Sequence, residues 1–524
     1  MGLVLKICTF GHCISTGKVV HCHIIAETMA LNKLTRFLIV LNLACATSIQ
    51  TLSAQYRMTL DEAIATSRSQ SVMALEAKHS FVSTYWAYRS YLASRLPSVT
   101  LYGNLMNYDR SLTLLQSYED GTFKYAETFN LQNSMGLQVS QNISLTGGRL
   151  LLYSDLSRID QFGVNNKLTW YTQPVTMSYI QPLFAYNQFR WDKKIEPLEY
   201  EKGKRKYIED MENLTIQTAS AYFSLISATR NYESSLMNCE NTGVMRDIAT
   251  ERMKIGTVTK DEYLQLELRA IKDSLQVGEC LVKMREAQMQ LNSLLGFDES
   301  VEILPVVEDY LPEVVIDYDL VLDKCLKNST FSLQNEINEL QAESAVAKAK
   351  ADRGVTMSLN ARLGLSQTGS SLPDAYKDLL DQEVVGVSFS IPIFDWGLGK
   401  GKVQKARAAQ EVVRAQTIQS ENDNRRKLFV AVGQFNTQRQ QCIASKRAMD
   451  VAAERYSIIM EKFRSGTATV TQLTDAQNDS DEARTKYLSD LGNFWNYYYT
   501  LRYYTLYDFI KGRDIDIDVT EMID

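Results

Sequence analysis

A chain of 524 residues would ordinarily hold about three globular domains, but this one contains only 8 prolines, and residues 198–304 and 393–524 contain none. Because proline breaks helix interiors at a cost of about 3 kcal/mol, these two stretches are free to form very long helices. The net charge of −6, from 56 basic and 62 acidic residues, gives no support to nucleic-acid binding, so no nucleic-acid partner is expected.

A secretory signal peptide is predicted over residues 29–54. Two basic residues precede an apolar run at residues 37–46, and small residues follow it as a cleavage site. The apolar run is too short to cross a bilayer as a helix. Residues 1–28 are interpreted as a mis-assigned leader upstream of the true start. Lipidation of Cys45 remains an alternative to simple cleavage of the signal.

Residues that commonly carry chemistry are scarce beyond the signal peptide. His79 is the only histidine there, and four cysteines stand far apart at positions 239, 280, 325 and 442. This spacing suggests small buried helix residues and no disulfide framework. The sequence also lacks a G-x-S-x-G element and a phosphate-binding glycine loop. We therefore expect no enzyme, no cofactor and no metal site.

An internal duplication organises the rest of the chain. Residues 175–184 (VTMSYIQPLF) recur as residues 385–394 (VGVSFSIPIF), and residues 251–259 (ERMKIGTVT) recur as residues 461–469 (EKFRSGTAT), both at an offset of about 210. The predicted domains are a first repeat at residues 55–304, a second repeat at residues 305–510 and an acidic tail at residues 511–524. Each repeat is expected to hold a helix, barrel strands and a pair of long helices.

The strand predictions come from alternating apolar and polar residues. The segments are residues 99–108, 135–145 and 175–183 in the first repeat, with residues 150–156 as a possible fourth, and residues 355–365 and 385–393 in the second. An upstream offset of about 256 means that the first repeat carries about 46 extra residues. We expect them to add a hairpin, which the sequence does not locate. Alternation alone fits a soluble sandwich as well as a membrane barrel.

Long helices connect these strands. Residues 398–464 would form a helix of roughly 100 Å, which must pack along partner helices because no single globular core could stabilise it. Gly256 and Gly466, each followed by threonines, mark tips where one long helix turns into the next. If the strands lie in lipid, their edges cannot stay unpaired. Four or six strands are too few to enclose a wide pore, so the chain would have to pool strands with copies of itself.

These features resemble the TolC family of outer-membrane efflux proteins over roughly residues 60–507. The similarity lies in the duplicated Pro-aliphatic-Phe elements at the strand-to-helix junctions and in the paired Gly-Thr-x-Thr tips; the junction residues are Pro182, Phe184, Pro392 and Phe394. The resemblance implies an α+β membrane protein, in which the duplicated repeat forms part of a trimeric transmembrane β-barrel that a periplasmic α-helical coiled-coil tunnel continues.

The resemblance also implies a function and a location. The chain would be an outer-membrane channel subunit of a Gram-negative efflux or secretion system, with a periplasmic adaptor, an inner-membrane pump and outer-membrane lipid as partners. Alternatives are a type I protein-secretion or metal-efflux duct on the same scaffold, or a periplasmic coiled-coil scaffold without a pore.

Particular residues take roles from this family. Acidic residues at the periplasmic gate would be Glu262 and Asp475, whereas Gln472 and Ala468 depart from the family's Asp and Arg and leave the gate's closing contacts undefined. The residues that would contact the adaptor at the tips are Arg252, Lys254, Gly256, Thr257, Lys462, Arg464, Gly466 and Thr467.

Overall fold

The computed structural model describes residues 56–116, 121–163, 166–307 and 310–516. The predicted leader and signal peptide, together with residues 517–524 of the predicted tail, lie outside the described residues. The chain forms two compact units. The smaller one joins Met1–Tyr56 to Ser300–Glu302, where the Tyr56 amide donates a hydrogen bond to the Glu302 carbonyl at 2.9 Å. The larger one comprises Arg57–Glu299 and Ile303–Asp524 and contains the repeats.

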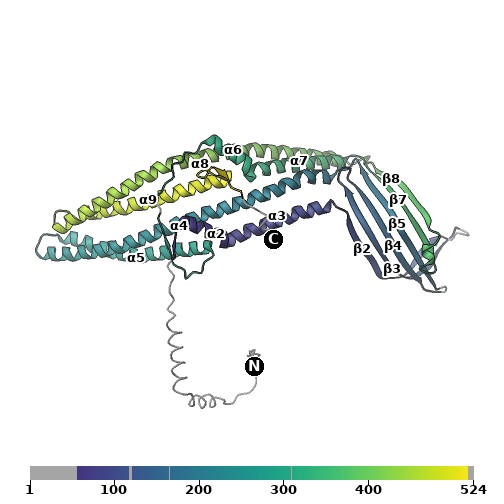
Figure 1. The fold of residues 1–524 in the computed structure, drawn as a ribbon, viewed down its shortest axis with the longest axis horizontal. Helices are drawn as coiled ribbons and strands as arrows, with labels where there is room; N and C mark the ends of the chain where they lie inside the picture. The colour runs from purple at the N-terminus through teal and green to yellow at the C-terminus, as the bar shows by residue number, and fades with distance from the viewer. Residues whose placement is uncertain (1–55, 117–120, 164–165, 308–309, 517–524) are drawn as a thin grey trace, which may run out of the picture. The chain divides into compact units, whose positions relative to one another are not determined.

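Each repeat contributes four helices to the larger unit (Figure 1). Helices α4 and α8 have 67 and 68 residues, which corresponds to roughly 100 Å each. The helix α4 begins before Pro197 and includes it, so the long helix starts earlier than the proline-free stretch suggested. The helices are α2 (Leu60–Gln70), α3 (Val72–Ser94), α4 (Gln188–Lys254) and α5 (Lys260–Leu295), then α6 (Tyr318–Asn328), α7 (Thr330–Arg353), α8 (Leu398–Ser465) and α9 (Val470–Thr505).

The six long strands form one antiparallel sheet in the order β2-β3-β4-β5-β7-β8. Strands β5 and β7 join the two repeats, and β2 and β8 are the two edges. The extra residues of the first repeat form the β3–β4 hairpin, which the sequence had left unplaced. The strands are β2 (Ser98–Gln116), β3 (Phe123–Ile143), β4 (Gly148–Gln161), β5 (Lys167–Leu183), β7 (Thr356–Gly369) and β8 (Leu380–Ser390).

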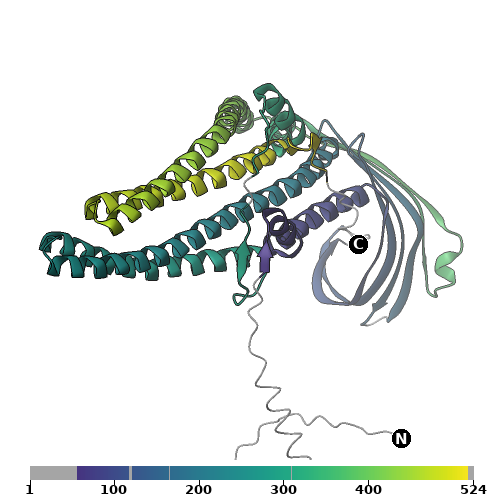
Figure 2. The same ribbon diagram turned by 60° about the vertical axis from the view of Figure 1, so that its left-hand side comes forward.

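The pairing register gives the sheet two chemically different faces. Leu359 lies opposite Val387, and Leu101 lies opposite Leu137, so apolar side chains line up across strands on one face. This apolar face is exposed: Leu101, Val385 and Phe389 keep 67%, 70% and 69% of their surface accessible. The opposite face is polar, and the sheet curves strongly in Figure 2.

Side chains on the polar face reach over the strand between them. The Tyr102 hydroxyl of β2 donates to Asp155 of β4 across Gly136 of β3, and the Gln173 amide of β5 donates to Gln382 of β8 at 2.9 Å. Each of these hydrogen bonds passes over a glycine of the intervening strand. In the second case this glycine is Gly364 of β7, which pairs with Gln382. A Cβ at Gly136 would lie 2.1 Å from Asp155 Oδ1, so only glycine leaves room for that crossing.

The first and the last described segments pack against the helices. Tyr222 of α4 donates its hydroxyl to the carbonyls of Met58 and Val306, both at 2.8 Å, where β1 (Tyr56–Met58) pairs with β6 (Ile303–Pro305). After α9, the short strands β9 (Tyr507–Asp508) and β10 (Arg513–Asp514) pair with each other, so the described start of the predicted tail is folded. A single-turn 3₁₀ helix, η2 (Asp374–Tyr376), lies between β7 and β8.

Among the described residues, no helix combines the length and the apolar composition that a membrane crossing requires. The described cysteines are unpaired, and three of the four are buried in helices, as the sequence indicated.

Candidate functional site

The predicted tips are two helix-to-helix turns at the end of the long helices far from the sheet (Figure 1). Gly256 follows α4 and Gly466 follows α8, with φ of 78° and 85°. This left-handed conformation is the one that lets a helix stop and the chain reverse, and glycine adopts it without steric cost. The next amide in each turn closes back on the helix: Thr257 N donates to Arg252 O at 3.0 Å, and Thr467 N donates to Lys462 O at 2.8 Å.

The second helix of each tip starts with the same cap. Thr259 caps α5 and Thr469 caps α9, and the residue three positions later bonds back to each threonine amide. In the first tip this residue is Glu262, whose Oε2 accepts hydrogen bonds from both Thr259 N and Thr259 Oγ1 at 3.0 Å. In the second tip it is Gln472, at 3.1 Å from Thr469 N. Glu262 is therefore held in a helix cap.

The two acidic residues predicted at the gate are not equivalent in the duplicated structure. Glu262 corresponds to Gln472 in the second repeat, whereas Asp475 corresponds to Gln265 in the first. Asp475 is exposed one turn into α9. Of the two, it is the carboxylate that stands clear of the cap.

An apolar cluster joins the two tips. It combines buried residues of both repeats, namely Met245, Ala249, Leu266, Met460, Phe463, Val470 and Leu473. Tyr456 packs against it, and burial raises the pKa of its phenol, so that side chain stays protonated at neutral pH. The tips therefore behave as one packed unit within the chain.

Arg252 ties the first tip to the second. Its guanidinium donates to Phe463 O at 3.0 Å and to Arg464 O at 2.8 Å, and it lies over the Phe463 ring at 5.9 Å. These carbonyls belong to the last turn of α8, where a cation is favourable because helix C-termini carry partial negative charge. The family resemblance implies that Arg252 contacts an adaptor, and in this structure its guanidinium forms hydrogen bonds within the chain.

The other predicted tip residues remain at the surface. Lys254 pairs with Glu251 at 2.8 Å, and Arg464 pairs with Glu461 at 3.0 Å, at equivalent positions of the two repeats. Exposed pairs of this kind contribute less than about 1 kcal/mol, so a docking partner could displace them easily.

The junction residues form a second group, at the sheet. Pro182 belongs to β5 and faces Ser358, and Phe184 follows with φ of 59°. In the second repeat Phe394 contacts Trp396 edge-on, with ring centroids 4.4 Å apart. These aromatic side chains are exposed where each strand turns into a long helix.

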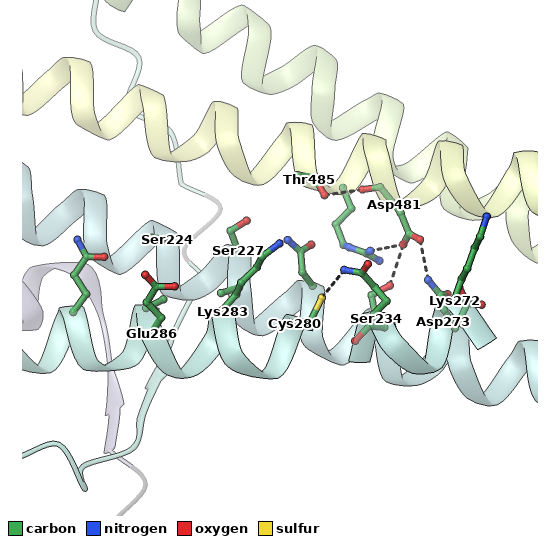
Figure 3. Close-up of a pocket in the computed structure, with 18 of the residues that line it drawn as sticks. Ser224, Ser227, Ser234, Lys272, Asp273, Cys280, Lys283, Glu286, Asp481 and Thr485 are labelled. Carbon is green, nitrogen blue, oxygen red and sulfur yellow. Dashed lines mark hydrogen bonds and ion pairs between the residues drawn. The ribbon is translucent and has the colours of Figure 1, made fainter. Parts of the chain in front are cut away.

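A polar cleft of about 740 Å³ runs between α4, α5 and α9, and the sequence did not predict it (Figure 3). Asp481 accepts hydrogen bonds from Ser234 Oγ at 3.0 Å and Asn238 Nδ2 at 2.8 Å, and it pairs with Arg484. Nearer the tips, Asp273 pairs with Arg269 at 2.9 Å. The described side chains include no group of His, Cys, Asp or Glu that could hold a metal ion.

The comparisons with known sequences agree on one family. Residues 322–503 match the family described as outer membrane efflux protein. Outer membrane protein TolC of Escherichia coli (strain K12) is 24% identical over 302 residues, or 54% of this chain and 60% of TolC. TolC of Salmonella enteritidis is 24% identical over 310 residues, with the same coverage. The match thus spans less than two thirds of the length of either relative.

The solved structures match nearly the whole chain. The Campylobacter jejuni CmeC outer membrane channel superposes with a TM-score of 0.64 and 16% identity, covering 88% of each chain. A membrane protein from Pseudomonas aeruginosa gives a TM-score of 0.62 at 13% identity, over 88% of this chain and 92% of that one. At these identities the likeness establishes the fold.

The description of the matched family names efflux proteins and not enzymes, and it names the outer membrane, in agreement with the predicted location. Residues 322–503 of the chain are thus similar to the outer membrane efflux protein family, the same kind of protein that its repeats and tips resemble.

Proposed function

We propose that this protein is the outer-membrane channel subunit of a tripartite efflux or secretion system. Three copies assemble a barrel in the outer membrane, and their long helices extend into the periplasm. There the tips receive substrates from a periplasmic adaptor and an inner-membrane pump. The channel itself is passive, because the pump supplies the energy.

One observation carries this proposal: the sheet has an exposed apolar face and two unpaired edges. Val385, Phe389 and Leu101 keep about two thirds of their surface accessible. Contiguous apolar surface of this kind is rare on a monomeric soluble protein, and it suits a lipid environment. It therefore counts against a periplasmic scaffold without a pore, whose sheet would present a polar exterior.

The edges support assembly with identical copies. Unpaired backbone groups in lipid cost several kcal/mol each, so both β2 and β8 need a neighbour. The two edge strands run in opposite directions, because strands alternate along the antiparallel sheet. The β8 edge of one copy can thus pair antiparallel with the β2 edge of the next, and repetition closes a ring.

The tips support contact with an adaptor. They are the exposed ends of the long helices, and the charged residues on them, such as Lys254 and Arg464, hold only weak surface pairs. Asp475 lies on the same end and is proposed to select cations, since symmetry copies of one carboxylate around an axis create a negative ring.

The cargo is a separate question. A protein-secretion duct or a metal-efflux duct on this scaffold remains an alternative, because no described residue distinguishes the substrate. Neighbouring genes that encode the pump and the adaptor would discriminate between these classes.

Membrane fractionation followed by native mass measurement in detergent tests the assembly. We expect the protein in the outer-membrane fraction with three times the mass of the mature chain, and ion conductance after reconstitution in a bilayer. A soluble monomer without conductance would refute the proposal.

Selectivity tests the gate. Asp475→Ala should weaken the cation selectivity of the reconstituted channel because it removes one carboxylate per subunit at the tip. The control is Glu411→Ala, which removes an exposed carboxylate of α8 that lies far from the tip in sequence and pairs with Arg414. Equal selectivity in the wild type and Asp475→Ala would remove this residue from the gate.

A further inference from the structure

The β3–β4 hairpin has no counterpart in the second repeat, which holds only β7 and β8. We propose that this hairpin is part of the membrane wall, so that each subunit contributes six strands and the assembled barrel is wider than the duplicated plan alone would build. The inference rests on the proposed function. It competes with a hairpin that folds outside the membrane or into the lumen.

The first support is the apolar face, which continues across the hairpin. In β3, Met135, Leu137 and Val139 lie opposite Gly103, Leu101 and Val99 of β2. Leu152 of β4 then lies opposite both Val139 and Met177 of β5.

The accessibility of these side chains agrees. Met135, Leu137 and Leu152 are 54%, 47% and 45% exposed, similar to Met177 at 46% and Leu363 at 49% in the shared strands. A hairpin in water or in an aqueous lumen would have no reason to present this face in register with the rest of the sheet.

The second support is the polar face, where the hairpin uses the same packing device as the shared strands. Tyr102 reaches Asp155 over Gly136 of β3, as Gln173 reaches Gln382 across β7. Both crossings lie on the polar face, so the hairpin strands share that face with the rest of the sheet.

The third support is the anchoring of the hairpin turn. Asn187, the cap of α4, donates its amide to Ser144 O at 3.1 Å and to Leu145 O at 3.3 Å. The Gln141 amide donates to Arg95 O, just after α3, at 2.9 Å. The turn is thus fixed at the helical end of the sheet, level with the start of β2 and the end of β5.

The consequence is a larger bore. With three copies, six strands per chain give about 18 strands, against about 12 if each repeat supplied two. Barrel diameter grows roughly linearly with strand number, so the bore would be about 1.5-fold wider, in the range where barrels hold an open aqueous channel.

Spin labels on neighbouring residues test the placement. In a Cys239→Ser background, which removes the only half-buried native thiol among the described cysteines, single cysteines are introduced as Leu137→Cys and Gln138→Cys in β3. The matched controls are Val387→Cys and Ser388→Cys in β8. Each labelled protein is reconstituted in lipid vesicles, and collision with oxygen, which partitions into lipid, is compared with collision with a water-soluble nickel chelate.

We expect oxygen to dominate several-fold at positions 137 and 387, and the nickel chelate to dominate at positions 138 and 388. If position 387 senses lipid and position 137 does not, the hairpin lies outside the wall and the inference is wrong, while the proposed function stands. If neither senses lipid, the proposed function fails with it. Should Leu137→Cys impair assembly, Leu152→Cys reports the same face from β4.

Discussion

A buried ion cluster in the middle of the helices makes a sharp prediction about stability. Glu212 of α4 is 1% exposed in its side chain and pairs with Arg68 of α2 and with Arg502 of α9, the latter at 3.0 Å. Arg502 also lies 3.4 Å from Asp508. The cluster thus joins α2, α4, the last turn of α9 and the short strand β9.

Glu212→Ala should destabilise the protein by about 3 kcal/mol, the lower end of the range for removing one partner from a buried pair. The lower end applies because the Arg68 side chain is 28% exposed and can rehydrate, whereas that of Arg502 is only 14% exposed and keeps Asp508 alone as its acidic partner. Glu212→Gln should lose less, since its amide oxygen still accepts a hydrogen bond.

Guanidinium unfolding of the detergent-solubilised protein, followed by tryptophan fluorescence, measures this loss as a shift of midpoint at constant slope. The matched control is Glu233→Ala on the same helix, whose partner Arg230 and own side chain are each 52% exposed. That pair should be worth less than about 1 kcal/mol. Equal midpoints for the two variants would refute the view that burial makes the Glu212 cluster costly to break.

Three further predictions follow from local geometry. Gly466→Ala should lower the melting temperature more than Gly256→Ala. Both glycines have positive φ, so each alanine costs roughly 1–2 kcal/mol of backbone strain. A Cβ at Gly466 would also lie 3.3 Å from Arg252 Nη2, whereas a Cβ at Gly256 would have no neighbour within 4 Å. Equal melting temperatures would mean that the Arg252 side chain moves aside without any loss of stability. Burial, together with the charge of Asp490, raises the pKa of the Cys442 thiol to about 11. Iodoacetamide at pH 8 should therefore modify Cys239 and leave Cys442 intact until the protein is unfolded. Modification of both cysteines in the native state would contradict this prediction. Burial opposes ionisation of Asp508, but the hydrogen bond from Tyr498 at 2.6 Å, the Lys511 amide and the charge of Arg502 outweigh it and hold the pKa of that carboxyl below its usual 3.8. Ionised Asp508 therefore stabilises the fold above pH 3.8, and this contribution is lost as the pH falls through the lower folded pKa. Asp508→Asn should make the unfolding free energy less dependent on pH in that acid range. An unchanged pH dependence would exclude the contribution of Asp508.

The sequence predicted the parts of this fold that its duplication repeats. The turns at Gly256 and Gly466 and the long helix at residues 398–464 were confirmed, because a left-handed glycine after a long proline-free stretch has a local cause. The strand candidates were also confirmed, although β2, β3 and β5 extend further than their alternation indicated. In β3, for example, Glu127 and Asn133 interrupt the apolar pattern.

The contacts between repeats could not be predicted in the same way. Arg252 looked like a surface charge, since nothing near it in sequence reveals that two carbonyls of α8 lie within hydrogen-bond distance. The polar cleft was missed for the same reason: Arg269 and Asp273 read as an ordinary solvated pair four residues apart on a helix. Whether the predicted tip and gate residues act as the family resemblance implies stays a prediction.

The position of the extra hairpin suggests how proteins of this kind can change. Strands β3 and β4 run in opposite directions. Inserting the pair therefore leaves the direction of every flanking strand and the starting point of every helix unchanged. A single additional strand would reverse all that follows. In a barrel of the proposed kind, evolution can therefore widen or narrow the opening by two-strand steps while the helices and their tips keep their structure.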